Sequence, residues 1–159
     1  MKEINITFTL QRYTWEELTE SDKILCQKAR DAAKQSYAPY SEFHVGAAVQ
    51  LVNGKIITGS NQENAAYPSG LCAERTALFY AGSSYPDQAV EALAIAAETK
   101  GKRVAKITPC GACRQVMLET EARGKTKMRV LMCGSDEILI CSDVLSLLPL
   151  SFMPSSLEG

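Results

Sequence analysis

The sequence is short of the residues that most structural metal sites require. It has one histidine, His44, and a single Cys-x-x-Cys pair, formed by Cys110 and Cys113. A closed structural zinc site needs four ligands, such as two Cys-x-x-Cys pairs or one pair with two histidines. Neither set is available here. We therefore expect a structural role for His44. If the protein binds a metal ion, we expect an open site, in which one coordination position has no protein ligand.

The sequence also lacks long runs of apolar residues and long runs of basic residues. No stretch reaches the ~18 apolar residues of a membrane helix, and no run of lysine and arginine could follow a phosphate backbone. Residues 1–10 are too polar for the core of a signal peptide. The net charge is -1 and the pI is about 5.9. We expect a soluble, cytoplasmic protein that acts on a small molecule and binds neither membrane nor nucleic acid.

The length of 159 residues suits one domain, and no linker or repeat divides residues 1–159. Apolar residues at alternate positions from Ile4 to Leu10 predict a half-buried N-terminal strand over residues 3–13. Asn53-Gly54 predicts a type I′ hairpin turn. Thr14 with Glu17, or Ser21, would cap the first helix. The other predicted strands are 45–52, 55–61, 89–99, 128–133 and 137–142, and the predicted helices are 21–35, 72–82 with Gly82 as a stop, 113–124 and 142–148.

This order of elements predicts an α/β fold. Helices alternate with strands in the middle of the chain, so we expect a mixed β-sheet of about five strands flanked by helices, with an N-terminal strand extension. Cys72 and Cys110 each open a predicted helix. Because loops at the carboxyl ends of strands gather in one crevice, we expect Cys72, Cys110 and Cys113 to meet there. Three thiolates would leave a fourth position for water, which is the layout of a catalytic zinc site.

Two charged residues follow Cys72 and suit this chemistry. Glu74 could take a proton from zinc-bound water and pass it on. Arg75 could donate hydrogen bonds to the thiolates and offset their charge. Simpler interpretations stay open for each residue taken alone: a redox dithiol for Cys110 and Cys113, a first-turn helix acid for Glu74 and a surface ion pair for Arg75. We expect the remaining cysteines to be core residues; these are Cys26, Cys133 and Cys141.

The combination of Cys-Ala-Glu at 72–74 with Pro-Cys-x-x-Cys at 109–113 resembles the signature of the zinc nucleoside and nucleotide deaminases. Further blocks between residues 37 and 152 are similar to the small homotetrameric cytidine deaminases: "YAPYSEFHVGAA", "GSNQENAAYPSGLCAERTAL", "TPCGACRQVMLE" and "LLPLSF". The resemblance implies hydrolysis of cytidine and deoxycytidine to uridine and deoxyuridine in pyrimidine salvage, by zinc-bound hydroxide with Glu74 as the proton shuttle. It implies one zinc ion per chain and a homotetramer whose pockets are shared between subunits.

The resemblance also implies roles for substrate-binding residues. Asn61 and Glu63 match the residues that hold the ribose hydroxyls, and Arg75 matches the arginine that tempers thiolate charge. Phe43 matches the ring that packs on the base, and the backbone of Ala73 matches the group that reads the edge of the base. Two aromatic residues match positions that line or close the pocket: Tyr67, and Phe152 from a neighbouring subunit.

Two segments depart from the resemblance. The N-terminal strand through Tyr13 is longer than in the shortest family members, and residues 98–107 are more basic than expected and could reshape the pocket rim. Three other functions compete with a cytidine deaminase. They are a deaminase of another aminopyrimidine such as blasticidin S, an editor of cytosine in RNA or DNA, and an interaction module with purely structural zinc.

Overall fold

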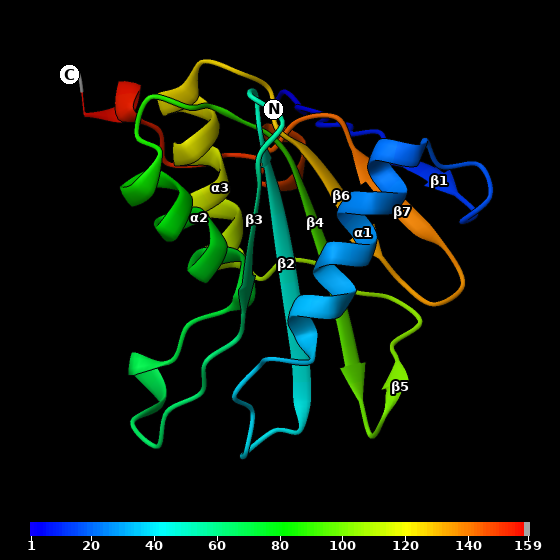
Figure 1. Ribbon diagram of the computed structural model, residues 1–159. Helices are drawn as coiled ribbons and strands as arrows, with labels where there is room; N and C mark the ends of the chain where they lie inside the picture. Colours follow the sequence, from blue (N-terminus) through cyan, green and yellow to red (C-terminus); the bar gives the residue numbers. More distant parts are fainter. Residues whose placement is uncertain (158–159) are drawn as a thin grey trace.

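A mixed β-sheet forms the centre of the protein in the computed structural model, which describes residues 1–157 (Figure 1). Within these residues the sheet has seven strands in the order β1-β7-β6-β4-β2-β3, with β5 paired to β4. All neighbours are antiparallel except β4 and β6. The strands are β1 Gln11–Tyr13, β2 Phe43–Leu51, β3 Ile56–Ser60, β4 Val90–Thr99, β5 Lys102–Arg103, β6 Arg129–Cys133 and β7 Ile138–Cys141. The α/β class and the mixed sheet are confirmed; β1 is the last part of the predicted N-terminal strand, and the short β5 is the strand that was not predicted.

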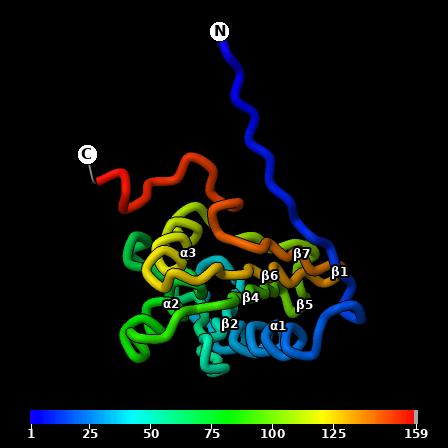
Figure 2. Tube along the Cα trace, turned by 90° about the horizontal axis from the view of Figure 1, so that it is seen from above, coloured from blue at the N-terminus to red at the C-terminus, as the bar shows by residue number. Residues whose placement is uncertain are grey.

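Helices cover both faces of this sheet (Figure 2). Helix α1, Glu20–Ala33, lies on one face, and α2, Ala73–Ser84, and α3, Gly111–Gly124, lie on the other. Alternate residues of β4 serve the two layers: Leu93 and Ile95 pack toward α2 and α3, whereas the small Ala94 packs toward α1. The period-2 pattern therefore builds two cores from one buried strand.

Two glycines allow the helices to approach the sheet closely, one on each face. A Cβ atom at Gly46 of β2 would lie 2.1 Å from the carbonyl oxygen of Ala29 in α1. A Cβ atom at Gly59 of β3 would lie 2.6 Å from the backbone nitrogen of Ala77 in α2. Both distances are far shorter than a van der Waals contact, so only glycine fits beneath either helix.

The strand directions bring the starts of α2 and α3 together. Strands β3 and β4 are each antiparallel to β2, so they run the same way and end at the same edge of the sheet. The chain enters α2 after β3 and enters α3 after β4 and β5. The amino ends of the two helices therefore meet at this edge, where open α/β sheets place their ligands.

The N-terminal strand prediction is wrong over most of its length. Only Gln11–Tyr13 pair with the sheet, opposite Ile140 to Ile138 of β7, and residues 1–10 form no strand within the described chain. The alternation of apolar residues from Ile4 to Leu10 is present, but no neighbouring strand of residues 1–157 extends beside it. Three apolar side chains that a half-buried strand would cover are more than half exposed: Ile4, Ile6 and Phe8.

Several predicted boundaries also differ. The hydroxyl of Thr19, not of Ser21, caps α1 by accepting from the backbone of Asp22 at 3.2 Å. Glu17 accepts from the backbone of Thr14 at 2.8 Å, but this contact closes a turn before the helix. Gly82 does not stop α2, which continues to Ser84.

The hairpin and the last helix differ in detail. Only Gly54, with φ +81°, has a left-handed backbone in the 53–54 pair, so the turn is not type I′. The predicted helix 142–148 is reduced to one 3₁₀ turn, Leu145–Leu147. The remaining 3₁₀ turns are Tyr67–Ser69 and Pro154–Ser156. Among the described residues there is no helix with both the length and the apolar character needed to cross a membrane.

Candidate metal centre and active-site pocket

Two cysteines occupy the N-cap positions of the helices that meet at the sheet edge. Cys72 caps α2 and Cys110 caps α3, both with extended backbone, and neither side chain bonds to the backbone N–H groups of its helix. Cys113 lies in the first turn of α3 and is fully buried. The helix dipoles favour negative charge at these positions, so thiolates are stabilised there.

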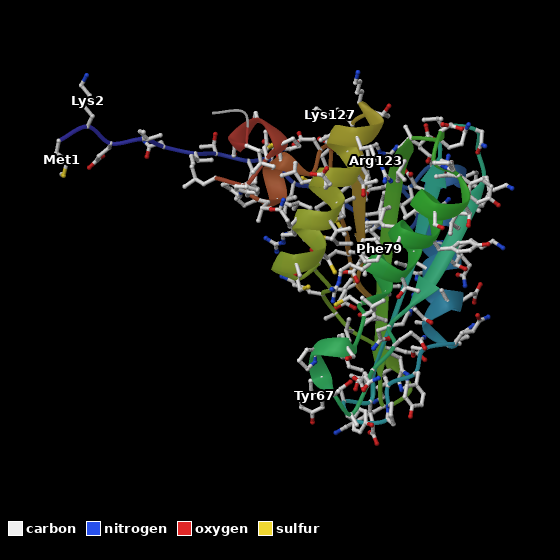
Figure 3. The ribbon with its side chains drawn as sticks, turned by 90° about the vertical axis from the view of Figure 1, so that its left-hand side faces the viewer. Met1, Lys2, Tyr67, Phe79, Arg123 and Lys127 are labelled. Carbon is white, nitrogen blue, oxygen red and sulfur yellow. The ribbon has the colours of Figure 1, made fainter. Side chains whose placement is uncertain are left out.

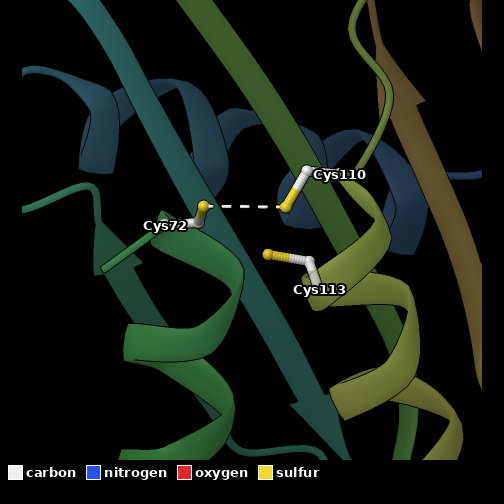
Figure 4. A group of neighbouring side chains, drawn as sticks. All are labelled: Cys72, Cys110 and Cys113. Carbon is white, nitrogen blue, oxygen red and sulfur yellow. Dashed lines mark hydrogen bonds between the residues drawn. The ribbon is translucent and has the colours of Figure 1, made fainter. Parts of the chain in front are cut away.

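The three sulfur atoms lie close enough to share one metal ion (Figure 4). The Sγ atoms of Cys72 and Cys110 are 3.9 Å apart, and all three Sγ atoms lie within 4.8 Å of one another. Tetrahedral zinc with ~2.3 Å bonds to sulfur separates its ligands by about 3.8 Å. Within residues 1–157, this is the one group of three or more potential ligands with such geometry. The donor set fits zinc and leaves one coordination position without a protein ligand.

The electrostatics of the thiols also suit a bound cation. Hydrogen bonding with Cys113 and with the Arg75 guanidinium lowers the pKa of Cys72 to about 5. The neighbouring Cys72 and burial raise the pKa of Cys113 instead. The opposite directions show that one thiolate forms readily, whereas a second negative charge beside it is unfavourable. A divalent cation would remove this conflict, because metal ligation deprotonates the coordinating thiols.

Arginine side chains hold both halves of the thiol cluster. Nη2 of Arg75 lies 3.8 Å from Sγ of Cys72, and its buried Nε has no hydrogen-bond partner within the described chain. Arg114 follows Cys113 directly; its Nε donates to the carbonyl of Pro109 at 2.9 Å and its Nη1 to the carbonyl of Leu147 at 2.9 Å. Arg114 is a positioning residue that the sequence analysis missed. Its place next to the last ligand was the signal that could have found it.

Glu74 is buried beside the thiols. Its side chain is 4% exposed and lines the same cavity as Cys72 and Cys110. Burial raises the pKa of this carboxyl group, and the negative charge of Cys72 raises it further. A carboxyl group with a raised pKa is suited to accept and release a proton near neutral pH. Burial also argues against an ordinary surface acid in the first turn of a helix.

A cavity of about 660 Å³ opens in front of these residues. This volume lies within the range of small-molecule sites. Most of the residues that the sequence assigned to the site line it together, namely Phe43, Asn61, Glu63, Tyr67, Cys72, Glu74, Arg75 and Cys110. The segment before the second zinc motif adds Ile107 and Thr108, whereas its Lys106 turns away toward Glu137 at 3.6 Å.

The polar wall of the cavity is fixed by backbone contacts. The Asn61 carboxamide accepts from the backbone of Val45 at 2.7 Å and donates to the carbonyl of Phe43 at 2.9 Å. One N–H and one lone pair of this group stay available for a ligand. Glu63 accepts from the backbone of Tyr40 at 2.9 Å and from the Ser41 hydroxyl, which lowers the pKa of its carboxyl group. Asn61 and Glu63 thus present oriented acceptors to the cavity.

The remaining candidates differ in how far they reach the cavity. Tyr67 lies at the rim, where it is 76% exposed, and Figure 3 shows it projecting from the body. The backbone of Ala73 begins α2 next to Cys72. Phe152 lies on the C-terminal segment, 60% exposed and outside the cavity of its own chain. His44 bonds to the Ser36 hydroxyl at 2.7 Å, in agreement with a structural role.

The sequence is similar to that of a known protein family. Residues 19–128 match the family model of the cytidine and deoxycytidylate deaminase zinc-binding region. A cytidine deaminase of Halalkalibacterium halodurans is 47% identical over 97 residues, which cover 61% of this chain and 70% of that protein. A cytidine deaminase of Sporosarcina psychrophila is 46% identical over 95 residues, covering 60% and 66%.

Solved structures give the same result. The crystal structure of a cytidine deaminase from Burkholderia pseudomallei superposes with a TM-score of 0.70 at 40% identity, covering 85% of this chain and all of that one. The cytidine deaminase of Mycobacterium tuberculosis gives a TM-score of 0.64 at 32% identity, covering 82% and 95%. The matched family region includes the three clustered cysteines and Glu74. The chain therefore belongs to the zinc-binding cytidine and deoxycytidylate deaminase family.

Proposed function

We propose that the protein hydrolyses cytidine and deoxycytidine to uridine and deoxyuridine with release of ammonia. The observation that carries this proposal is that a cluster of three thiols lies beside a buried carboxyl group, Glu74, at a cavity that Cys72, Cys110 and Glu74 line. The named relatives and solved structures that share this family are cytidine deaminases. A purely structural metal would need a fourth protein ligand and would have no use for Glu74.

Cys72, Cys110 and Cys113 would hold the zinc ion, which supplies a Lewis acid that lowers the pKa of a coordinated water molecule. Glu74 accepts the proton of the attacking water as the new C–O bond forms at C4 of the pyrimidine. The same carboxyl group delivers this proton to ring N3. It then takes the proton of the new hydroxyl group at C4 and passes it to the amino group. The C4–N bond breaks and ammonia leaves, so one water is consumed for each amine released.

Arg75 and Arg114 support this chemistry without contacting the reacting atoms. The guanidinium of Arg75, which contacts Cys72, would offset the negative charge of the thiolates around a bound divalent ion. Arg114 fixes the Pro109 carbonyl and thereby the loop that carries Cys110. Both are positioning residues in this proposal.

Binding of the sugar and base would orient C4 toward Glu74. Asn61 and Glu63 present oxygen acceptors that suit the hydroxyl groups of a ribose or deoxyribose. Phe43 offers a ring for packing on the base, and the backbone of Ala73 lies next to Cys72 where it can read the base edge. Orientation by parts of the substrate that do not react lowers the barrier of the chemical step.

We further propose a homotetramer in the cytoplasm that serves pyrimidine salvage. Phe152 lies outside the cavity of its own chain and is exposed, which suits a residue that closes the pocket of a neighbouring subunit with Tyr67 at the rim. The exposed Leu150 beside it adds apolar area to the same segment. Such exposed apolar groups often mark contacts between protein chains.

The test is the Glu74→Gln variant, assayed by absorbance with cytidine while zinc per chain is measured. We expect turnover to fall by about 10³-fold or more with zinc retained, because the amide cannot carry the proton. Glu16→Gln, on an exposed loop residue, is the matched control and should leave turnover unchanged. Full activity in Glu74→Gln would overturn the proposal.

Substrate choice is tested on the unmodified protein. Turnover of cytidine, blasticidin S and a cytosine in single-stranded DNA should rank cytidine first. The ribose-facing groups Asn61 and Glu63 favour a nucleoside, and the acidic pI of about 5.9 disfavours a nucleic acid. Faster turnover of either competitor would replace the proposed substrate and leave the proposed chemistry intact.

A further inference from the structure

The N-terminal residues 1–10 form an arm that leaves the body of the protein. Figure 2 shows it running straight away from the sheet, and Figure 3 places Met1 and Lys2 far from the helices. An extended chain of ten residues reaches ~33 Å. Its apolar side chains stand on alternate positions and are exposed: Ile4 88%, Ile6 53%, Phe8 57% and Leu10 36%. A strand pattern therefore exists without a surface to cover it.

The arm has no strand partner because its neighbour ends. Gln11 pairs with Ile140 and β7 stops at Cys141, one residue beyond this pair. Within residues 1–157, the chain after β7 turns away into Leu145–Leu147 and no other strand lies beside the arm. In addition, β1 is the last strand of the sheet, so its outer edge is open. Open edges and unpaired strand segments are sites where another chain adds a strand.

We infer that the arm binds the arm of a second copy of this chain, so that the two arms form an antiparallel two-stranded ribbon between the protomers. The sequence of the arm is self-complementary in an antiparallel register centred on Thr7. In this register Ile4 faces Leu10 of the second copy and Ile6 faces its Phe8, so each of the four alternating apolar residues meets an apolar residue. Identical segments that pair in this way form a two-fold symmetric interface, which is the commonest kind in homo-oligomers.

Exposed apolar residues on the segment after β7, the strand that pairs with β1, offer a surface that a paired arm could cover. A two-stranded ribbon is marginal in water unless its apolar face is covered. Leu145 and Leu150 follow β7 in the chain and are 46% and 92% exposed. The C-terminal segment and the arm project from the same side of the sheet in Figure 2. In the antiparallel register the tip of each arm returns toward this side of the other protomer.

The inference rests on the proposed assembly of copies of the chain, and hydrogen exchange combined with light scattering tests the two separately. At concentrations where the mass exceeds one chain, backbone amides of residues 4–9 should exchange about 100-fold more slowly than in an unstructured peptide. Dilution to the monomer should abolish this protection. The double variant Ile6→Ser with Phe8→Ser should raise the concentration of half-dissociation about tenfold or more.

The matched control places serine on the other side of the arm, in the double variant Asn5→Ser with Thr9→Ser, which should dissociate like the parent protein. Unprotected amides in an oligomer, or amides that stay protected after dilution to the monomer, would overturn the arm pairing and leave the assembly proposal untouched. A protein that is monomeric at about 100 µM would overturn both. None of these outcomes alters the Glu74→Gln test, because that test measures turnover and zinc.

Discussion

The six cysteines fall into two groups, in which the same thiol side chain has different surroundings and a different role. Cys72, Cys110 and Cys113 stand at the amino ends of two helices, near an arginine and a cavity. Cys26 and Cys133 face each other across the other core, with their Sγ atoms 2.8 Å apart, beneath α1.

The difference lies in the surroundings of the sulfur atoms. The pKa of Cys133 is raised by its contact with Cys26 and by burial, whereas that of Cys72 is lowered to about 5 by Cys113 and Arg75. Cys141 is the third core thiol; burial raises its pKa, and it donates to the carbonyl of Asp143 at 3.2 Å. Chemistry in this protein depends on where a thiol sits relative to helix ends and cations.

The strongest test of this comparison replaces one thiol in each group. Cys113→Ser should reduce zinc from one ion per chain to nearly none and abolish turnover, because a neutral hydroxyl is a poor zinc ligand. Cys141→Ser is the matched control and should retain both zinc and activity. Metal content by atomic absorption and turnover with cytidine check the result. Equal zinc in the two variants would show that the helix-end position confers no special affinity.

The next test removes the positive charge of Arg75 from beside the three clustered thiols. Arg75→Gln should keep zinc and lower turnover about 10- to 100-fold, because uncompensated thiolate charge makes the metal a weaker Lewis acid. Arg12→Gln removes a guanidinium whose side chain is 74% exposed and should leave turnover unchanged. Turnover of Arg75→Gln at the parent level would remove Arg75 from the mechanism.

A smaller effect on activity is expected at the polar wall of the cavity. Asn61→Ala leaves the Val45 N–H and the Phe43 carbonyl without their side-chain partner. We expect a higher KM for cytidine and a loss of about 1–3 kcal/mol in the free energy of unfolding. Steady-state kinetics and denaturant unfolding separate the two effects. A variant with lower stability and an unchanged KM would limit Asn61 to a structural role.

The smallest effect on activity should come from the core thiols. Cys26→Ala leaves zinc and turnover unchanged but removes packing beneath α1, at a cost of about 1–2 kcal/mol in the free energy of unfolding. Denaturant unfolding and a zinc assay check this expectation. Loss of zinc in Cys26→Ala would mean that the two groups of cysteines are coupled through the sheet.

Local patterns predicted the site better than they predicted the ends of elements. The thiol cluster followed from helix starts and spacing, because Cys72 and Cys110 each precede a helical pattern. Gly82 was wrongly predicted to end α2, because the reason for a glycine at this position is a contact with Arg123, which is remote in the sequence. A Cβ atom there would lie 2.7 Å from Nη2 of Arg123 in α3, so this glycine makes room for a side chain rather than ending a helix.

Contacts between segments that are distant in the sequence could not be predicted either, because local patterns do not show which segments meet. Ile4 to Phe8 have a genuine strand pattern, but pairing depends on where β7 ends, which the arm's own residues do not encode. Arg114 was missed because its partners are backbone carbonyl groups. Every residue has such a group, so the sequence does not show which ones accept a hydrogen bond from a side chain. The turn at 53–54 has the expected residues, yet only Gly54 adopts the left-handed backbone.

Gly59 has a consequence for metal affinity although it carries no functional group. A methyl group at this position would meet the carbonyl oxygen of Ala73 at 2.9 Å as well as the nitrogen of Ala77, and would lift the start of α2 from β3. Coordination bonds tolerate displacements of only ~0.2 Å. Cys72 directly precedes Ala73 in the chain. The missing side chain of Gly59 in β3 therefore helps to set the distance between the sulfur atom of Cys72 and those of Cys110 and Cys113 at the start of α3.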